Sequence, residues 1–230
     1  MHHTHVGLLA ALVLTLAAAP CVAGGFSVSP VRLFLGERDR ATALRLSNDA
    51  DTELALRAEL HAWSQDEQGR DRLEPSDDLI LSPPVLRLAP RSEQVVRLIV
   101  TVPRDPMRQM SYRLLLHEDR PSTQATAGGL PISLVLSLPV FLTPNGARHS
   151  LRCELNAHEG DSRAVWCINA GSAHARIGRV DLMDGPQMLG RHEGSIYLLP
   201  GTRVRIPMAL EPDMQPGPHH TLRALLDGPL

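Results

Sequence analysis

Few residues of this chain have the spacing that metal binding requires. Eleven histidines are present, but no HExxH or HxxxH spacing occurs after residue 24. This pattern favours scattered surface histidines over a metal site. The acidic residues Glu74, Asp77 and Asp78 could bind Ca²⁺, yet they lack the repeated ligand spacing of a calcium-binding loop, so a solvated turn is favoured. The sequence therefore predicts no metal site.

Catalytic signatures are equally scarce. The chain has no nucleophile-elbow motif and no glycine-rich phosphate loop. All 23 basic residues are arginine, so chemistry that needs a lysine, such as a Schiff base, is excluded. The net charge of −2 and the 3% aromatic content do not favour nucleic-acid binding. We expect a protein that is not an enzyme, needs no cofactor and binds no nucleic acid.

The N-terminus has the pattern of an export signal. Residues 6–19 (VGLLAALVLTLAAA) form an apolar run that is too short to cross a bilayer, and small residues follow it. We predict a signal peptide over residues 1–24, cleaved near Ala23 or Gly24. Lipid attachment at Cys21 is disfavoured because Pro20 precedes it. No other stretch could span a membrane, so stable membrane insertion is not expected.

Removal of this signal leaves two cysteines, Cys153 and Cys167. An even pair in an exported protein is most simply a disulfide. The two residues lie in strand-like runs on either side of Gly160, and a hairpin that turns there would place them opposite each other. A metal site or a nucleophilic cysteine would need a nearby histidine or base at suitable spacing, which is absent.

Short runs of alternating apolar and polar residues fill the chain from residue 26 onward. Turn sequences such as SNDAD, LAPRS and VPRDP separate these runs, and no convincing helix is present. This pattern is typical of an all-β sandwich fold. We predict two sandwich domains, over residues 25–144 and 148–230, joined by a short linker.

One segment, Leu130–Leu142 (LPISLVLSLPVFL), is exceptional. Its even positions from 130 to 138 are large aliphatic residues, which predicts a strand with one strongly apolar face. The simplest interpretation is a strand that faces its own core. However, Pro131 and Pro139 cannot donate to a sheet ladder and therefore favour an edge strand. A loop-like stretch, 117–129, precedes the segment in place of a tight turn.

An apolar edge strand is normally protected by charged residues. This one has no charge from Leu130 to Asn145. An edge left in that state suggests a template on which another chain adds a strand.

The order of several motifs resembles that of the periplasmic pilus-assembly chaperones of the chaperone–usher pathway. The resemblance rests on FSVSPVRLFL, RLSNDAD, LSPPVLRLAPRSEQVVRL, SYRLLLHE and LPVFLTP, and it is closer to the non-classical, archaic branch. It extends over essentially the whole chain after the signal. It implies two immunoglobulin-like domains set at an angle, like a boomerang.

The resemblance also implies a function and a binding strand. Such a chaperone binds pilus subunits in the periplasm by donor-strand complementation and delivers them to an outer-membrane usher. The inserted residues would be Leu130, Ile132 and Leu134, with Leu136 as a fourth. Self-association of the free form, which would hide the strand, is left open. The alternative is an exported β-sandwich adhesion or structural module whose apolar strand is simply core.

A carboxylate anchor is implied in the same way. The family binds the C-terminal carboxylate of the subunit with an arginine of the first strand and a lysine late in the donor strand. Arg32 matches the arginine, but the lysine position falls near Pro139 and this chain has no lysine. Arg97 and Arg113 are secondary candidates for the missing cation. Without the resemblance, Arg32 would be interpreted as a solvated strand residue.

Overall fold

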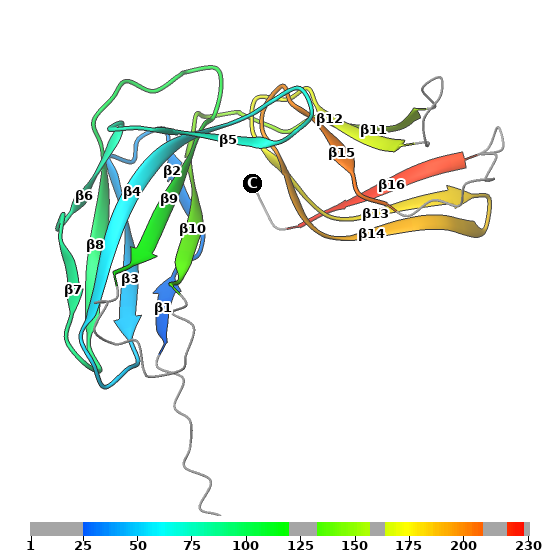
Figure 1. Cartoon of the computed structure of the whole chain (residues 1–230). Helices are drawn as coiled ribbons and strands as arrows, with labels where there is room; N and C mark the ends of the chain where they lie inside the picture. Colours follow the sequence, from blue (N-terminus) through cyan, green and yellow to red (C-terminus); the bar gives the residue numbers. More distant parts are fainter. Residues whose placement is uncertain (1–24, 120–132, 157–163, 209–219, 228–230) are drawn as a thin grey trace, which may run out of the picture.

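The computed structural model describes residues 25–119, 133–156, 164–208 and 220–227. In these ranges the chain forms strands and no helix. Two pairs of sheets stack into two sandwiches that lie at an angle to each other (Figure 1). The predicted all-β architecture of two domains is confirmed. The predicted signal peptide, residues 1–24, lies outside the described residues.

The first domain contains strands β1 to β10. One sheet has the order β1-β3-β8-β6, with strands Phe26–Ser29, Ala41–Asn48, Glu93–Val100 and Leu79–Ser82. The other has the order β2-β10-β9-β4-β5, with strands Leu33–Gly36, Val135–Thr143, Met110–Glu118, Leu54–Gln65 and Asp71–Pro75, and β7 (Leu86–Leu88) also pairs with β4.

Alternating leucines fill the space between these two sheets. Leu35, Leu46, Leu98 and Leu114 are fully buried and belong to one core cluster. The polar residues between them point outward, because successive side chains of a strand face opposite sides of the sheet.

The first segment of the chain crosses from one sheet to the other. β1 pairs antiparallel with β3, and β2 pairs parallel with β10 in the opposite sheet. The cis peptide Ser29–Pro30 lies between them. Proline has no backbone N–H to give to either ladder, which suits a point where the chain leaves one sheet for the next.

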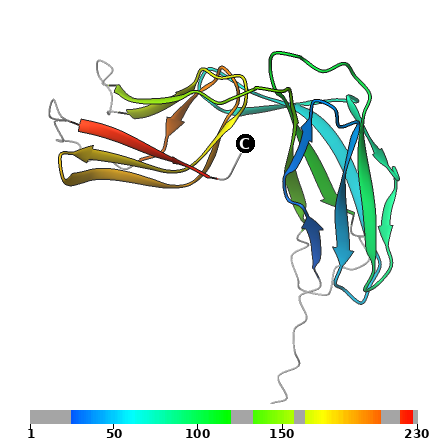
Figure 2. The ribbon, with the colours of Figure 1, turned by 180° about the vertical axis from the view of Figure 1, so that it is seen from behind.

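The second domain is smaller. Its two three-stranded sheets have the orders β11-β12-β15 and β14-β13-β16 (Figure 2). The strands span Leu151–Asn156, Ala164–Asn169, Arg203–Ile206, Gln187–Leu198, Ala175–Asp184 and His220–Leu226. Its core is correspondingly small and includes Val165, Ile177 and Leu198.

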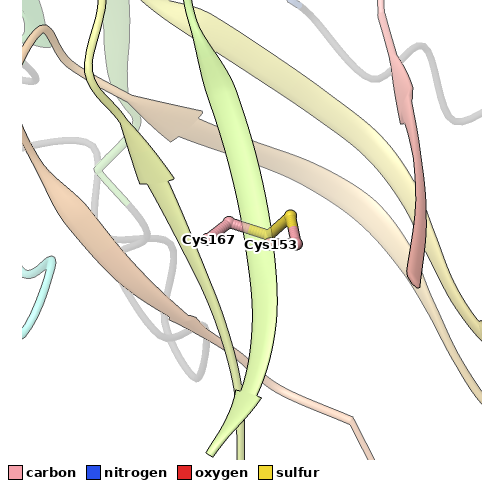
Figure 3. Close-up of a disulfide and its surroundings, with 2 residues drawn as sticks. All are labelled: Cys153 and Cys167. Atoms are coloured by element: carbon pink, nitrogen blue, oxygen red, sulfur yellow. A yellow bond between two sulfur atoms is a disulfide. The ribbon is translucent and has the colours of Figure 1, made fainter. Parts of the chain in front are cut away.

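A disulfide joins neighbouring strands of this domain. Cys153 of β11 lies directly opposite Cys167 of β12 in the antiparallel register, and the two are bonded (Figure 3). The predicted disulfide is therefore present. The turn expected at Gly160 falls in residues 157–163, which lie outside the described residues.

Other expectations need adjustment. Asp71–Pro75, not expected to be a strand, forms β5, so Glu74 belongs to that strand. Asp78 Oδ2 accepts a hydrogen bond of 2.8 Å from the Tyr112 hydroxyl, which gives this acidic side chain a structural role.

The described ranges contain no helix that could cross a membrane. The domain boundaries 25–144 and 148–230 stay predictions, with β1–β10 inside the first and β11–β16 inside the second.

Candidate functional site at the open edge of β10

The strand β10 is paired on both sides along only half its length. From Val140 to Leu142 it lies between β9 and β2, and Thr143 pairs with β2 alone. From Val135 to Pro139 it pairs with β9, and no strand within the described ranges pairs with its other edge. Its backbone groups on that side are consequently available to a further strand.

The burial of the side chains also falls toward the unpaired end of β10. Leu138 and Val140 are buried, whereas Leu136 is partly buried against the end of the core. Leu134, just before the strand, is 42% exposed, and Val135 is exposed as well. The predicted strand thus begins at Val135 in the structure. Leu130 and Ile132 lie outside the described residues.

Arg32 lies where the unpaired edge of β10 meets β2. It directly precedes Leu33, which is the register partner of Val140. Because Leu33 and Leu35 face the core, Arg32 belongs to the outer face of the sheet. In the described part of the chain, its side chain makes no hydrogen bond or ion pair.

Pro139, near which the resemblance places a lysine, is flanked by arginines. Arg113 of β9 is its register partner on one side, and Arg32 lies at the start of β2 on the other. The Arg113 guanidinium lies 3.7 Å from the centroid of the Trp63 ring and 3.7 Å from Asp71 Oδ2. Burial lowers the pKa of Arg113, and the Asp71 carboxylate opposes that shift. Arg97 is exposed on β8, in the other sheet, away from this site.

A buried histidine of the second domain completes the site. The His174 ring stacks on Phe141 of β10 at a centroid distance of 3.9 Å. Burial, together with the charges of His149, Arg32 and Arg176, lowers the pKa of His174 to about 4. His174 is therefore neutral at neutral pH, and the cationic groups around it are guanidinium groups. Such a positive site suits a carboxylate, which arginine binds through paired hydrogen bonds.

The site is positioned by the joint between the domains. Trp63 and Phe141 of the first domain cluster with Leu199 of the second, and Tyr197 packs against them. Together with Phe34, which stacks on Phe141, this joint holds four of the seven aromatic residues of the chain. Their concentration in one place was not predicted, although the scarcity of aromatics marks each one for attention.

Two glutamines tie the domains together at this joint. Gln65 accepts hydrogen bonds from the Leu199 backbone N–H and the Thr202 hydroxyl, each at 2.9 Å, and donates to the Tyr197 carbonyl. Gln109 accepts from the backbone N–H of His174. The sequence analysis also did not predict these two glutamines, because the type and position of a glutamine in the sequence do not show which residue it contacts in the fold.

No metal site is evident in the residues that the structure describes: nowhere among them do three His, Cys, Asp or Glu side chains gather in a suitable arrangement. The site has the features of a protein-binding edge: a strand with one edge unpaired over Val135–Pro139 in the described ranges, exposed aliphatic residues and a cationic end.

Comparison with known proteins identifies the family. Residues 25–148 match the family model of the pili and flagellar-assembly chaperone, PapD N-terminal domain. Because this match covers more than half of the chain, the protein belongs to the pilus-assembly chaperone family. No curated protein matches the sequence.

Solved structures share the fold at low identity. One is a chain of the CsuC–CsuE chaperone–tip adhesion subunit complex from the archaic chaperone–usher Csu pili of Acinetobacter baumannii, with 19% identity, a TM-score of 0.67, and coverage of 87% of this chain and 98% of that chain. Another is the CupB2 chaperone of Pseudomonas aeruginosa, with 16% identity, a TM-score of 0.57, and coverage of 88% and 100%.

A third belongs to the complex of the Salmonella enterica SafA pilin with the SafB chaperone. It has 13% identity and a TM-score of 0.59, and the match covers 89% of this chain and 91% of that chain. The fold predicted from the motif order is thereby confirmed. Membership of this family does not favour the alternative of an adhesion module.

Proposed function

We propose that this protein is a periplasmic chaperone that binds pilus subunits by donor-strand complementation and delivers them to an outer-membrane usher. In donor-strand complementation the chaperone lends a strand to a subunit whose own fold lacks one. The observation that carries the proposal is the half-open edge of β10. Its unpaired half bears exposed aliphatic side chains, while the other half is fixed between β9 and β2.

A subunit strand beside Val135–Pro139 would continue the sheet of the first domain. By the two-residue period of a strand, Leu134 and Leu136 share a face, so both would lie under the added subunit. We propose that Leu130 and Ile132 extend the same row. Each buried aliphatic side chain contributes about 1.5–3 kcal/mol, and each new backbone hydrogen bond about 0.5–1.5 kcal/mol.

The end of that strand would meet Arg32. β2 runs parallel to β10 and starts at Leu33, so a strand on the open edge would be in line with β2. If it runs in the same direction, its carboxyl terminus ends beside Arg32. We propose Arg32 as the carboxylate anchor, with Arg113 on the far side of Pro139 as the second cation in place of a lysine. Arg97 lies on the other sheet and is left out of this role.

Export supports the location. The apolar run at residues 6–19, followed by small residues, would direct the chain out of the cytoplasm and into the periplasm. The periplasm is the compartment in which pilus subunits need protection before assembly.

The proposed role of β10 is tested by placing a charged residue at its unpaired half. Leu134→Asp, alone and combined with Ile132→Asp, is co-expressed in the periplasm with the pilus subunit encoded beside this chaperone. The control is Ile80→Asp, at a residue that is 50% exposed on the edge strand β6. We expect the Leu134 variants to fold and to recover no subunit on affinity purification, and the control to recover it normally. Full recovery by the Leu134 variants would refute the proposal, and their unfolding would favour a core strand.

The anchor is tested separately. Arg32→Ala should abolish subunit recovery while leaving the melting temperature nearly unchanged, because the side chain has no ion pair to lose in the described structure. Arg97→Ala, an arginine on the opposite sheet, is the matched control. Unimpaired recovery with Arg32→Ala would remove the anchor assignment.

A further inference from the structure

The sheet β11-β12-β15 of the second domain carries arginines and a tryptophan on its solvent side. Cys153, Cys167 and Val204 are register partners in this sheet, and they belong to the core cluster of the domain. Because successive side chains of a strand face opposite sides of the sheet, the residues next to them face outward. These outward residues form two rows across the three strands: Arg152, Ile168 and Arg203, and then Glu154, Trp166 and Arg205.

Trp166 lies at the centre of this outer face. Its side chain is partly exposed, and the central guanidinium carbon of Arg203 lies 4.0 Å from the centroid of its ring. Stacking uses the flat face of a guanidinium group and leaves the N–H groups at its edge able to bind a carboxylate. Nε of Arg203 has no hydrogen-bond partner among the described residues. The stack therefore holds a cation in place without neutralising it.

The positive charges of the outer face are not balanced by neighbouring carboxylates. Among the residues that the structure describes, Arg152, Arg203 and Arg205 form no ion pair. Glu154 is the one acidic residue in the two rows, which contain three arginines. Arg152 and Arg203 lie on either side of Ile168, two strand spacings or roughly 10 Å apart. The face thus has an apolar centre with cationic groups around it.

The outer face points away from the site at β10. The sheet β11-β12-β15 forms the side of the second domain that is remote from the concave space between the domains (Figure 1). β10 lies on the side of the first domain that borders this space, and the view from behind agrees (Figure 2). A subunit paired with β10 would therefore leave the outer face accessible to another molecule.

The charges of the outer face indicate the chemistry of that molecule. A symmetric pair of copies of this chain would place the same arginines against each other, which is unfavourable. The net charge of −2 provides no positive field for an anionic membrane. Tryptophan and arginine are the residue types that most often dominate the binding energy of protein interfaces. These properties favour an acidic protein surface.

We propose that the outer face of β11-β12-β15 binds a protein other than the subunit held at β10, and that this partner presents carboxylates on both sides of an apolar side chain. The carboxylates pair with Arg152, Arg203 and Arg205, and the apolar side chain packs on Trp166 and Ile168. This inference goes beyond the proposed function, because the chain would bind a subunit and this second protein at the same time on opposite sides.

Photo-crosslinking in the periplasm tests the outer face. Benzoylphenylalanine replaces Ala164, which lies two residues before Trp166 on the same side of β12. The cells also make the subunit and the usher encoded beside this chaperone, and the linked peptide is identified by mass spectrometry. We expect a link to a segment that contains Asp or Glu. Its yield should fall about tenfold when Arg152→Glu and Arg203→Glu are combined.

Matched variants separate charge from misfolding. Arg38→Glu combined with Arg97→Glu, at two exposed arginines of the first domain, should leave the yield unchanged. Arg152→Gln combined with Arg203→Gln, which removes the charges without reversing them, should lower the yield in the same direction. Lysine in place of the carboxylates of the linked segment should restore the link to the charge-reversed chaperone.

Several results would overturn the proposal. They are the absence of a link at Ala164, a link to lipid, a link to a second copy of this chain, and a yield that does not respond to charge reversal. Leu134→Asp, which is expected to abolish subunit binding at β10, should keep the link. Loss of the link in that variant would assign the outer face to the bound subunit and would likewise overturn the proposal.

Discussion

The side-chain oxygen of Gln65 accepts a hydrogen bond of 2.9 Å from the backbone N–H of Leu199, across the joint between the two domains. The same oxygen accepts from Thr202, and the side-chain nitrogen donates to the Tyr197 carbonyl. The side chain of Gln65, on β4, therefore makes hydrogen bonds to three groups of the second domain. This arrangement holds the angle of the molecule by directional bonds in addition to apolar packing.

Gln65→Ala should weaken the joint. The Leu199 N–H would lose its partner in a partly buried place, which costs about 1–3 kcal/mol. We expect the free energy of unfolding in urea to fall by about that amount, with Trp63 fluorescence as the reporter at the joint. Gln68→Ala, at an exposed position in the adjoining hairpin, should have little effect. An unchanged free energy with Gln65→Ala would mean that the bonds to the second domain do not stabilise the fold.

Gly69→Ala should force the domains apart. Gly69 lies in the β4–β5 turn with φ +78°, and an added Cβ would lie 2.5 Å from Val204 Cγ2 and 2.7 Å from Val204 Cα in the second domain. Gly146→Ala is the matched control, since Gly146 has the same φ and no atom within 4 Å of the new Cβ. The control bears only the backbone strain, about 1 kcal/mol. We expect Gly69→Ala to be the more destabilising and to change the small-angle scattering profile, and equal behaviour of the two variants would contradict the close approach.

Stability should fall as the pH falls from 6.5 to 4. The pKa of His174 drops from its ordinary value of 6.5 to about 4 in the folded protein, chiefly because of burial. Between these values the unfolded chain binds a proton that the folded chain does not, so acid favours unfolding. The slope from this residue approaches about 1.4 kcal/mol per pH unit, and its stabilisation is complete above pH 6.5.

His174→Asn tests that assignment. Asparagine keeps a side-chain N–H for Gln109 Oε1, which lies 2.9 Å from His174 Nδ1, but it does not titrate. We expect the pH dependence of unfolding by urea to lose about one proton between pH 6.5 and 4. The same slope in wild type and variant would assign the effect to other groups.

Loss of the disulfide should act on the second domain. Cys153 and Cys167 are 14 residues apart, and closing a loop of that size stabilises a fold by about 3 kcal/mol. The double substitution Cys153→Ala and Cys167→Ala should lower the free energy of unfolding by a comparable amount. Trp166, which neighbours Cys167 on β12, should report the change by fluorescence. A variant as stable as wild type would show that the small core suffices without the bridge.

Local patterns explain which parts of the fold could be predicted. The alternation around Leu134 and Leu136, the prolines of that segment and the spacing of the two cysteines are properties of neighbouring residues, and they predicted strands, an edge and a bridge. The joint depends instead on residues such as Gln65 and Leu199, which are 134 positions apart. No period in the sequence marks such a pair.

The residues of the candidate site also differ in whether the sequence alone could indicate them. Arg32 could be selected from its place in a motif, because the motif keeps its order along the chain. That Arg113 lies opposite Pro139, and that His174 of another domain stacks on β10, depends on the register of strands and on the docking of domains. These relationships appear only when the chain is folded.

Phe141 has a consequence for how the molecule responds to force. It lies on β10, the strand with the open edge, and also belongs to the aromatic cluster that joins the domains. Separating the two domains would therefore remove packing contacts from Phe141, within β10. Loosening of the joint would therefore reach the strand that carries the open edge.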